Sequence, residues 1–273
     1  MLKLIAVLPL LAMVGCSDAQ VREPPPSEVT LARHGELAKT SVSTASARSV
    51  ARGAKAVARS DDLSEFKLSY SAAVGAIPAL ARMIEEQAEK AETEMRRAAR
   101  SDRESAIKAG YTFRPHMVSF VWKVVADLPR FLSVSNSFAG YTGGAHGSYG
   151  VSGLVWDKEA QRALTGTELF VSPSALQQAL GRRFCAALDV QRRERRGGDG
   201  KVGGEFDECP PIEDLTVLVG SSDKRTFNRL TLYAGPYVAG PYAEGAYEID
   251  LPVDTAVLAA VKPEYRSAFD AAR

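Results

Sequence analysis

Residues 136–150 read NSFAGYTGGAHGSYG and lie between two runs of residues that are typical of strands. Glycines concentrated between strands indicate backbone that takes positive φ or passes close to a neighbour, where a Cβ atom would not fit. The stretch is therefore predicted to be a shaped loop around which the chain is organised. Its residue types do not identify a reaction centre.

One long helix and several strands are predicted around this loop. Residues 66–70 alternate apolar and polar side chains and predict a strand. Ile77 and Pro78 open a long helix, since proline is tolerated in a first turn, and Gly110 ends it. The apolar stripe of this helix is Leu80, Ile84, Ala88, Ala91, Met95 and Ala98. Further strands are predicted at 113–126, 130–138, 149–156 and 162–165. One helix followed by consecutive strands favours an α+β fold with an antiparallel sheet on which the long helix packs.

A second α+β half is predicted from residue 171 onward. Ser172 and Pro173 resemble a helix cap and a first-turn proline, and one face of the helix that follows carries Leu176, Leu180, Phe184 and Leu188. Strands are predicted at 215–219, 226–233 and 246–251, and closing helical turns at 254–260 and 264–271.

An arginine cluster ends the helix of the second half and consists of Arg192, Arg193, Arg195 and Arg196. Cations in a last helical turn are favourable against the helix dipole, which favours a structural role. Binding of a polyanion is the alternative.

The N-terminus resembles a bacterial lipoprotein signal. A positive start at residues 1–3 precedes an apolar run at 4–14 that is too short to span a bilayer. Residues 13–16, MVGC, resemble a lipobox, which predicts removal of residues 1–15 and lipidation of Cys16. Ser17 after the cysteine resembles the sorting pattern for the outer membrane, so the chain is expected to face the periplasm. The alternative is ordinary cleavage near Ala19 with Cys16 discarded.

Residues 16–62 have the composition of a tether. They include a proline run at 24–26 and are otherwise rich in Ala, Ser, Thr, Arg and Lys. Residues 48–59 are predicted to form at most a frayed basic helix. A solvated spacer is favoured over an arm that touches anionic lipid or cell wall, because few charges are involved.

Three cysteines are present, and lipidation of Cys16 would leave Cys185 and Cys209 as a pair. Export to an oxidising compartment favours a disulfide between them, with free thiols as the alternative. A metal site is not predicted, because neither cysteine has a second Cys or His at ligand spacing.

Composition excludes several classes of function. The 273 residues are 45% hydrophobic and 25% charged, with a formal net charge of +1, which is ordinary for a globular protein. A near-neutral balance argues against nucleic acid as a partner, since that needs a large basic surface. No second apolar segment is long enough to cross a membrane.

Three stretches resemble the paired domains of unknown function that are found in PdaC-type peptidoglycan deacetylases, ahead of their catalytic domain, and in the extracytoplasmic part of RsiV-type anti-sigma factors. The stretches are residues 66–99, YTGGAH at 141–146 with LTGTELF at 164–170, and LTLY at 230–233 with GPYAEG at 240–245. The resemblance implies a PdaC-like domain at 63–170 and an RsiV-like domain at 171–273. The latter is similar in fold alone to a subdomain of Hsp70-type ATPases, with no nucleotide site.

The resemblance carries limited functional information. The anti-sigma branch uses these domains to recognise lysozyme, but the cytoplasmic and transmembrane parts of such a regulator are not found here. The deacetylase branch takes its chemistry from a separate metal-binding domain that is also not found. The resemblance therefore implies a non-catalytic protein without a cofactor, whose partner is a lysozyme-like protein or peptidoglycan.

Motifs that suggest chemistry have the wrong context. GDGKVG at 198–203 fits the dinucleotide-binding pattern but follows a helix end instead of a strand. His146 is more typical of a hydrogen-bonding anchor than of a base or ligand. The predicted ligand-binding residues are Tyr141, Gly143, Gly144, His146, Tyr237 and Tyr242, where rigid turns present aromatic side chains.

Two alternatives to recognition remain. A hydrolase acting on peptidoglycan or glycan would use His146 with an acid such as Asp157 or Glu244, and these groups would then converge in one cleft. A purely structural envelope protein is the third hypothesis.

Overall fold

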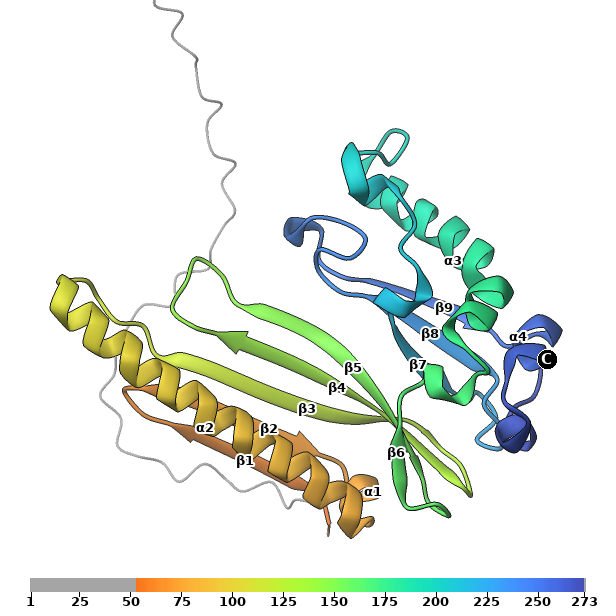
Figure 1. Ribbon diagram of the computed structural model, residues 1–273, viewed down its shortest axis with the longest axis horizontal. Coiled ribbons are helices and arrows are strands. Elements are labelled where there is room, and N and C mark those ends of the chain that lie inside the picture. The colour runs from red at the N-terminus through yellow and green to blue at the C-terminus, as the bar shows by residue number, and fades with distance from the viewer. Residues whose placement is uncertain (1–52, 273) are drawn as a thin grey trace, which may run out of the picture. The chain divides into compact units, whose positions relative to one another are not determined.

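The computed structural model in Figure 1 describes residues 53–272 of the chain. The predicted signal peptide, Cys16 and most of the predicted tether lie outside the described residues. The predicted α+β class is confirmed: a six-stranded sheet with a long helix is followed by a three-stranded sheet with a second long helix.

The first sheet has the strand order β1-β2-β3-β4-β5-β6. Its strands are β1 (Lys55–Ser60), β2 (Ser64–Tyr70), β3 (His116–Asp127), β4 (Phe131–Tyr141), β5 (Ser148–Asp157) and β6 (Arg162–Leu164). The strands from β3 to β6 form the predicted antiparallel meander, whereas β2 and β3 are parallel. β2 and β3 are parallel because the long helix between them returns the chain to the end of the sheet where β2 began, and β3 starts there.

The prediction of a basic helix at 48–59 is wrong for residues 55–59, because they belong to strand β1. β1 pairs with β2 in an antiparallel register that places Val57 opposite Leu68, and Val57 packs against the core under the sheet. Lys55 and Arg59 form ion pairs with glutamates on the long helix. These contacts with distant residues override local helix preference, and the folded part begins before residue 63.

Helix α2 (Pro78–Ala109) connects β2 to β3 and lies against them (Figure 1), after the short helix α1 (Ala72–Gly75). Pro78 occupies the first turn and Gly110 caps the end with φ of 74°, as predicted. The first part of the predicted stripe is buried, but the buried face continues through Ala99 and Ala106, and Ala98 is exposed. Ala99 and Ala106 lie five full turns of 3.6 residues after the buried Ala81 and Ala88, so the buried face keeps its direction, and the predicted stripe was off by one residue at Ala98.

The second sheet has the order β7-β8-β9 and packs with helix α3. Its elements are β7 (Thr216–Gly220), β8 (Arg229–Ala234), β9 (Tyr247–Pro252), α3 (Pro173–Arg196) and α4 (Thr255–Ala260). Short 3₁₀ helices lie at Thr167–Leu169, Gly204–Asp207, Ile212–Asp214, Tyr242–Glu244 and Pro263–Ala268. The Ser172 hydroxyl accepts a hydrogen bond from the Ala175 N–H, which confirms the predicted cap. The four apolar residues predicted on one face of α3 are all buried.

Two hydrophobic cores organise residues 53–272. One lies between α2 and the first sheet and contains Phe66, Trp122 and Trp156. The other is shared by both halves: Phe131 of β4 lies in it with its ring centroid 5.8 Å from that of Phe227. The two halves therefore meet through apolar side chains. Among these residues, no helix has the length and apolar character needed to cross a membrane.

Candidate recognition site around the glycine loop

The stretch singled out in the sequence is a hairpin connection. β4 and β5 pair as far as Gly140 and Ser148, and residues 142–147, the glycine loop, join them. Gly143 has φ of 84°, and a Cβ at Gly147 would lie 2.8 Å from the Gly140 carbonyl oxygen, so both positions need glycine. Gly144 meets neither condition, since its φ is not positive and a Cβ there would meet nothing within 4 Å.

Tyr141 ties the start of the loop to its middle. Its hydroxyl donates to the Gly144 carbonyl oxygen at 3.0 Å and accepts from Nη1 of Arg114 at 3.3 Å. Tyr141 and Gly144, both predicted to bind a ligand, therefore bond to each other in this structure.

His146 and Tyr242 join the loop to the second half of the chain. Their rings stack with centroids 4.1 Å apart and planes at 26°. The Tyr242 hydroxyl donates to the Gly147 carbonyl oxygen at 2.8 Å, and Nδ1 of His146 lies 2.9 Å from the same oxygen. Two side chains that are 96 positions apart in the numbering thus converge on one backbone carbonyl. His146 has the anchoring role that its sequence context favours.

Two further tyrosines complete an aromatic cluster, defined here as His146, Tyr149, Tyr237 and Tyr242. Tyr149 packs edge-on against Tyr242, with ring centroids 5.8 Å apart. Tyr237 also packs against Tyr242, with ring centroids 5.7 Å apart. Tyr149 is 40% exposed and Tyr237 is 58% exposed. Tyr149 was not among the candidate residues predicted from the sequence, although it lies in the glycine-rich stretch. Side chains alternate between the two faces of a strand, and this periodicity along β5, where Tyr149 pairs with Ala139, was the signal available in the sequence.

Tyr237 has an unusual backbone conformation. Its φ is 69°, in the left-handed region that costs a residue with a side chain about 1–2 kcal/mol. Two hydrogen bonds hold the turn: Tyr237 N–H donates to the Gly240 carbonyl at 3.0 Å, and Val238 N–H donates to the Gly235 carbonyl at 3.1 Å. The turn therefore keeps an exposed tyrosine in a strained position.

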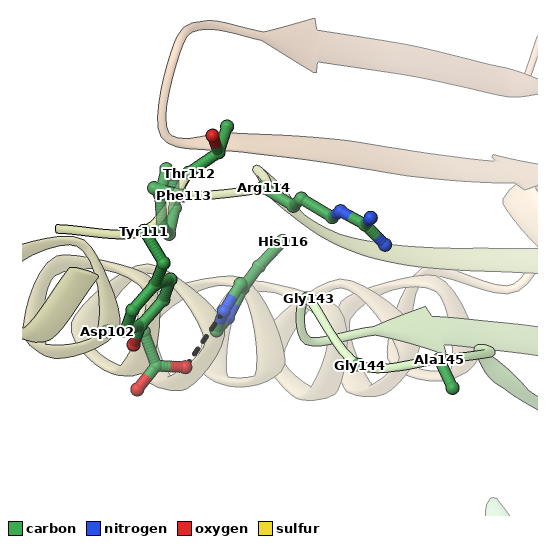
Figure 2. Close-up of a pocket in the computed structure, with 9 residues that line it drawn as sticks. All are labelled: Asp102, Tyr111, Thr112, Phe113, Arg114, His116, Gly143, Gly144 and Ala145. Atoms are coloured by element: carbon green, nitrogen blue, oxygen red, sulfur yellow. Dashed lines mark ion pairs between the residues drawn. The ribbon is translucent and has the colours of Figure 1, made fainter. Parts of the chain in front are cut away.

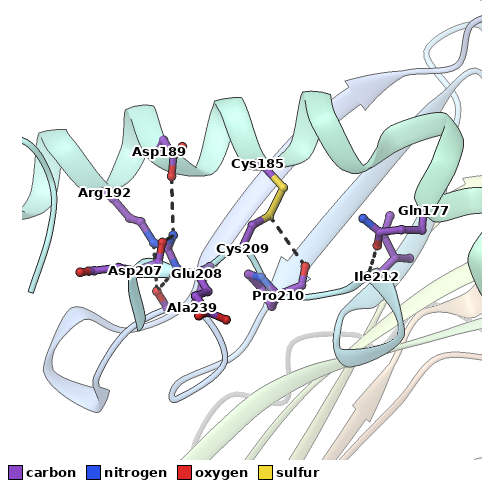
Figure 3. Close-up of a disulfide and its surroundings, with 10 residues drawn as sticks. All are labelled: Gln177, Cys185, Asp189, Arg192, Asp207, Glu208, Cys209, Pro210, Ile212 and Ala239. Atoms are coloured by element: carbon purple, nitrogen blue, oxygen red, sulfur yellow. Dashed lines mark hydrogen bonds and ion pairs between the residues drawn. A yellow bond between two sulfur atoms is a disulfide. The ribbon is translucent and has the colours of Figure 1, made fainter. Parts of the chain in front are cut away.

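The arginine cluster of α3 binds the chain itself. Arg192 is 2% exposed, and it donates to the carbonyl oxygens of Ala239 and Glu208 at 2.8 Å each (Figure 3). Arg195 donates to the carbonyl oxygens of Glu244 and Ala246. These bonds fix the segment that presents Tyr237 and Tyr242. They give these arginines a structural role, but their partners are loop carbonyls and not the carbonyls of the helix end that the prediction named.

The predicted disulfide between Cys185 and Cys209 is present and fastens α3 to the segment before β7 (Figure 3). The Cα atoms are 5.6 Å apart, and the bridge closes a separation of 24 residues. In the chain-entropy account, a loop of this length contributes about 3.5 kcal/mol of stability. The bridge adjoins the carbonyls of Asp207 and Glu208 that accept from Arg192.

The acids that a hydrolase would need are engaged elsewhere. Asp157 ends β5, ten residues long, so at about 3.3 Å per residue it lies roughly 30 Å from the loop end of that strand. Burial disfavours its charged form, but hydrogen bonds from Arg130 and from two backbone N–H groups outweigh that cost and hold its pKa below the ordinary value.

Glu244 is similarly occupied. It accepts from Nε of Arg196 at 3.0 Å and from the Tyr247 hydroxyl at 2.5 Å. Burial raises its pKa, but these hydrogen bonds prevail and the pKa lies below its ordinary value. A carboxylate held ionised by an arginine is poorly suited to donate a proton at neutral pH. Asp157 is too far from His146 to share a cleft with it, and Glu244 is occupied by Arg196 and Tyr247.

Gly143 and Gly144 line a separate cavity with α2 and the segment before β3 (Figure 2). Of the six predicted binding residues, His146, Tyr237 and Tyr242 are in the aromatic cluster, and Gly143 and Gly144 line this cavity. Tyr141 lines a smaller cavity together with His146. In the described part of the chain, no group of three or more His, Cys, Asp or Glu side chains is placed to hold a metal ion.

One family model matches part of the chain. Residues 57–149 match the family model described as deacetylase PdaC. The match contains β2, α2 and the glycine loop and ends at Tyr149, which confirms the predicted resemblance for this segment. It also begins inside β1, in agreement with the strand that the sequence did not predict. No curated protein matches the chain.

Two solved structures are similar to the chain. A member of the DUF3298 family from Bacteroides fragilis is 17% identical and covers 73% of this chain and 88% of its own, with a TM-score of 0.44. A DUF3298 family protein from Pseudomonas aeruginosa is 16% identical and covers 81% of this chain and 97% of its own, with a TM-score of 0.45.

Proposed function

We propose, from the premise that residues 57–149 form a PdaC-type domain, that this chain is a non-catalytic protein of the cell envelope that recognises a partner through its aromatic cluster. The partner is a lysozyme-like protein or a cell-wall ligand. The chain is held at the membrane, facing the periplasm, by a lipid on Cys16, with the outer membrane as the expected location.

The aromatic cluster is the observation that carries this proposal. Tyrosine offers a large contact area with few rotatable bonds, so binding through it loses little conformational entropy. Tyr149 and Tyr237 expose that area, and both pack against the less exposed Tyr242. The strained backbone at Tyr237 supports a functional role, because such strain persists where surrounding structure maintains it.

The hydrogen bonds that hold the aromatic cluster in place favour recognition over catalysis. Tyr242 and His146 are engaged with the Gly147 carbonyl, and Arg192 and Arg195 fix the turns from the other side. A rigid surface binds with a smaller ordering cost than a mobile one. The acids that the hydrolase hypothesis names, Asp157 and Glu244, are held in ion pairs with Arg130 and Arg196.

Binding of the full chain, purified in mild detergent, to lysozyme and separately to peptidoglycan fragments tests the proposal. We expect saturable binding to one of them, weakened at least about tenfold by Tyr237→Ala or Tyr149→Ala, as for aromatic residues at the centre of an interface. Phe138→Ala is the matched control. Phe138 is 38% exposed and pairs with Gly150, so it lies on the opposite face of the same hairpin from Tyr149.

The outcomes separate the hypotheses. Binding to lysozyme alone identifies a protein partner, and binding to peptidoglycan alone identifies a cell-wall ligand. Saturable binding to neither would reject the recognition proposal and leave the structural envelope protein as the better hypothesis.

The lipid anchor has its own test. Cells that express the full chain are supplied with a labelled fatty acid, and incorporation into the protein is measured. Cys16→Ser is expected to abolish the label and to release the protein from the membrane fraction. A labelled Cys16→Ser protein would contradict the proposed anchor. Fractionation of inner and outer membranes then tests the location.

A further inference from the structure

A cavity of about 560 Å³ lies on the α2 side of the glycine loop (Figure 2). Its polar lining comes from Asp102 on α2, from Tyr111 and Arg114 in the segment before β3, and from His116 at the start of β3. Gly143 and Gly144 line it from the loop. The volume is within the roughly 300–1,000 Å³ that is usual for small-molecule sites.

His116 is the buried polar group of this cavity. Its side chain is 1% exposed, and neither ring nitrogen has a hydrogen-bond partner. Nε2 lies 3.0 Å from Oδ2 of Asp102, which is close enough for an ion pair, but the approach is not aligned for a hydrogen bond. Phe113 stacks on the ring with centroids 5.9 Å apart. A buried polar group without a hydrogen-bond partner is unfavourable, and a polar group of a bound ligand would supply the missing partner.

Arg114 and Asp102 carry opposite charges and line the same cavity, but they do not pair with each other. Among residues 53–272, Arg114 forms no ion pair, and its one side-chain hydrogen bond is to the neutral hydroxyl of Tyr141. The Asp102 side chain is 53% exposed, and among residues 53–272 its one ion-pairing neighbour is the imidazole of His116. In Figure 2 the guanidinium of Arg114 and the carboxylate of Asp102 extend to different sides of His116.

We propose that this cavity binds a small zwitterion, an amino acid or dipeptide, with its carboxylate on Arg114 and its ammonium group on Asp102. An arginine binds a carboxylate with two parallel hydrogen bonds, and a carboxylate accepts from an ammonium group. His116 lies between the two charges and meets a polar group of the ligand. The apolar parts of the ligand contact Tyr111 and Phe113. This site is independent of the proposed recognition surface, since the residues that hold the ligand are not in the aromatic cluster.

Titration calorimetry on the full chain tests the proposal with alanine and alanyl-alanine in both L and D forms as probes. Two analogues remove one charge each: the N-acetylated dipeptide has no ammonium group, and the dipeptide amide has no carboxylate. We expect one of the zwitterionic probes to bind with one site per chain and both of its analogues to bind at least about tenfold more weakly, a difference of about 1.4 kcal/mol.

Substitutions assign each charge to its partner. Arg114→Gln is expected to weaken the zwitterion at least about tenfold but to leave the affinity of the amide analogue unchanged, because that analogue lacks the group that Arg114 binds. Asp102→Asn is likewise expected to weaken the zwitterion at least about tenfold but to leave the affinity of the N-acetylated analogue unchanged, because that analogue lacks the ammonium group that Asp102 binds. The matched controls are Arg100→Gln and Glu104→Gln, which change exposed charges on α2 outside the cavity. Thermal unfolding of each variant shows whether it is folded.

Three results would overturn the inference. The first is no saturable binding of any probe at about 10 mM, well above the weak millimolar range. The second is equal affinity for the N-acetylated analogue, which would indicate a simple anion site. The third is a folded Arg114→Gln protein that binds the zwitterion as well as the unchanged chain does.

Discussion

The two ends of the β4–β5 hairpin differ in exposure although the same two strands form both. At the end near the β3–β4 turn, Phe131 and Val155 are each 1% exposed. At the loop end, Phe138 is 38% exposed and Tyr149 is 40% exposed. Strand pairing continues through both ends, so the ladder does not explain the difference. The difference comes from what covers each end, because the shared core packs on the first, whereas the second meets the partly exposed Tyr237 and Tyr242 of the second half.

Polar groups are also used differently at the two ends. At the buried end Asp157 is 0% exposed and accepts hydrogen bonds from Arg130 and from the N–H groups of Glu159 and Ala160. At the loop end, tyrosine hydroxyls bond to neutral carbonyls and leave the ring faces accessible. The comparison indicates that burial stabilises the end near the β3–β4 turn, whereas the loop end is less buried and leaves aromatic surface exposed.

The largest effect is expected at the centre of the buried end. Phe131→Ala removes a ring that packs on Phe227 and Tyr265 in the shared core. A cavity of this kind costs about 3–5 kcal/mol. Urea unfolding of the full chain measures it, and Phe138→Ala at the loop end is the control, expected to cost about 1 kcal/mol or less. Equal costs at both ends would contradict the comparison.

A pH-dependent effect is expected at Asp157. Asp157→Asn leaves Arg130 without its buried carboxylate and is expected to cost about 2 kcal/mol at neutral pH. Because the pKa of Asp157 is below its ordinary value in the folded chain, its contribution is complete above the unfolded pKa of about 4 and is lost as the pH falls through the folded pKa. The difference between the two proteins should therefore shrink in acid.

Unfolding free energies measured between neutral pH and about pH 2 test this prediction. Glu159→Gln, whose carboxylate is 72% exposed and 3.3 Å from Arg130, is the control and is expected to change stability by less than about 0.5 kcal/mol. A difference that grows in acid would contradict the assigned direction of the pKa shift.

A smaller effect is expected in the glycine loop, where two adjacent glycines differ. Gly143→Ala places a Cβ on a backbone with φ of 84° and is expected to cost about 1 kcal/mol. Gly144→Ala meets open space at an ordinary φ and is expected to be nearly neutral. Parallel thermal unfolding of the two variants measures the difference, and equal effects would show that the loop does not require the left-handed conformation.

The smallest effect on stability is expected at Tyr242. Tyr242→Phe keeps the stacked ring but removes the donor to the Gly147 carbonyl oxygen, at a cost of about 0.5–1 kcal/mol. Chemical denaturation measures that cost, and hydrogen exchange of the amides at 142–147 shows whether the loop opens more often. Unchanged exchange would mean that the bond does not hold the loop in place.

Local patterns predicted much of the framework. Pro78 and Gly110 bound α2, and Ser172 caps α3, because these signals act within a few residues of themselves. The positions of most strands followed from apolar alternation, with bounds that differ by a few residues. The disulfide followed from counting cysteines in a chain that was expected to be exported.

Other features depend on contacts between distant segments and were missed. β1 was read as basic tether, since its strand form comes from pairing with β2 and from ion pairs to α2. The parallel arrangement of β2 and β3 was not visible in either strand. Tyr149 joined the aromatic cluster only when the fold placed Tyr237 and Tyr242 beside it.

The sequence by itself determined the α+β class, the two long helices, the cysteine pair and the special character of residues 136–150. These features rest on periodicity, capping and backbone freedom, which are properties of neighbouring residues. Only the tertiary structure decided that Arg192 is buried against loop carbonyls, that Asp157 and His146 lie at opposite ends of one hairpin, and that His116 faces a cavity. The physical reason is that burial and charge pairing depend on which segments meet, and no local pattern encodes that.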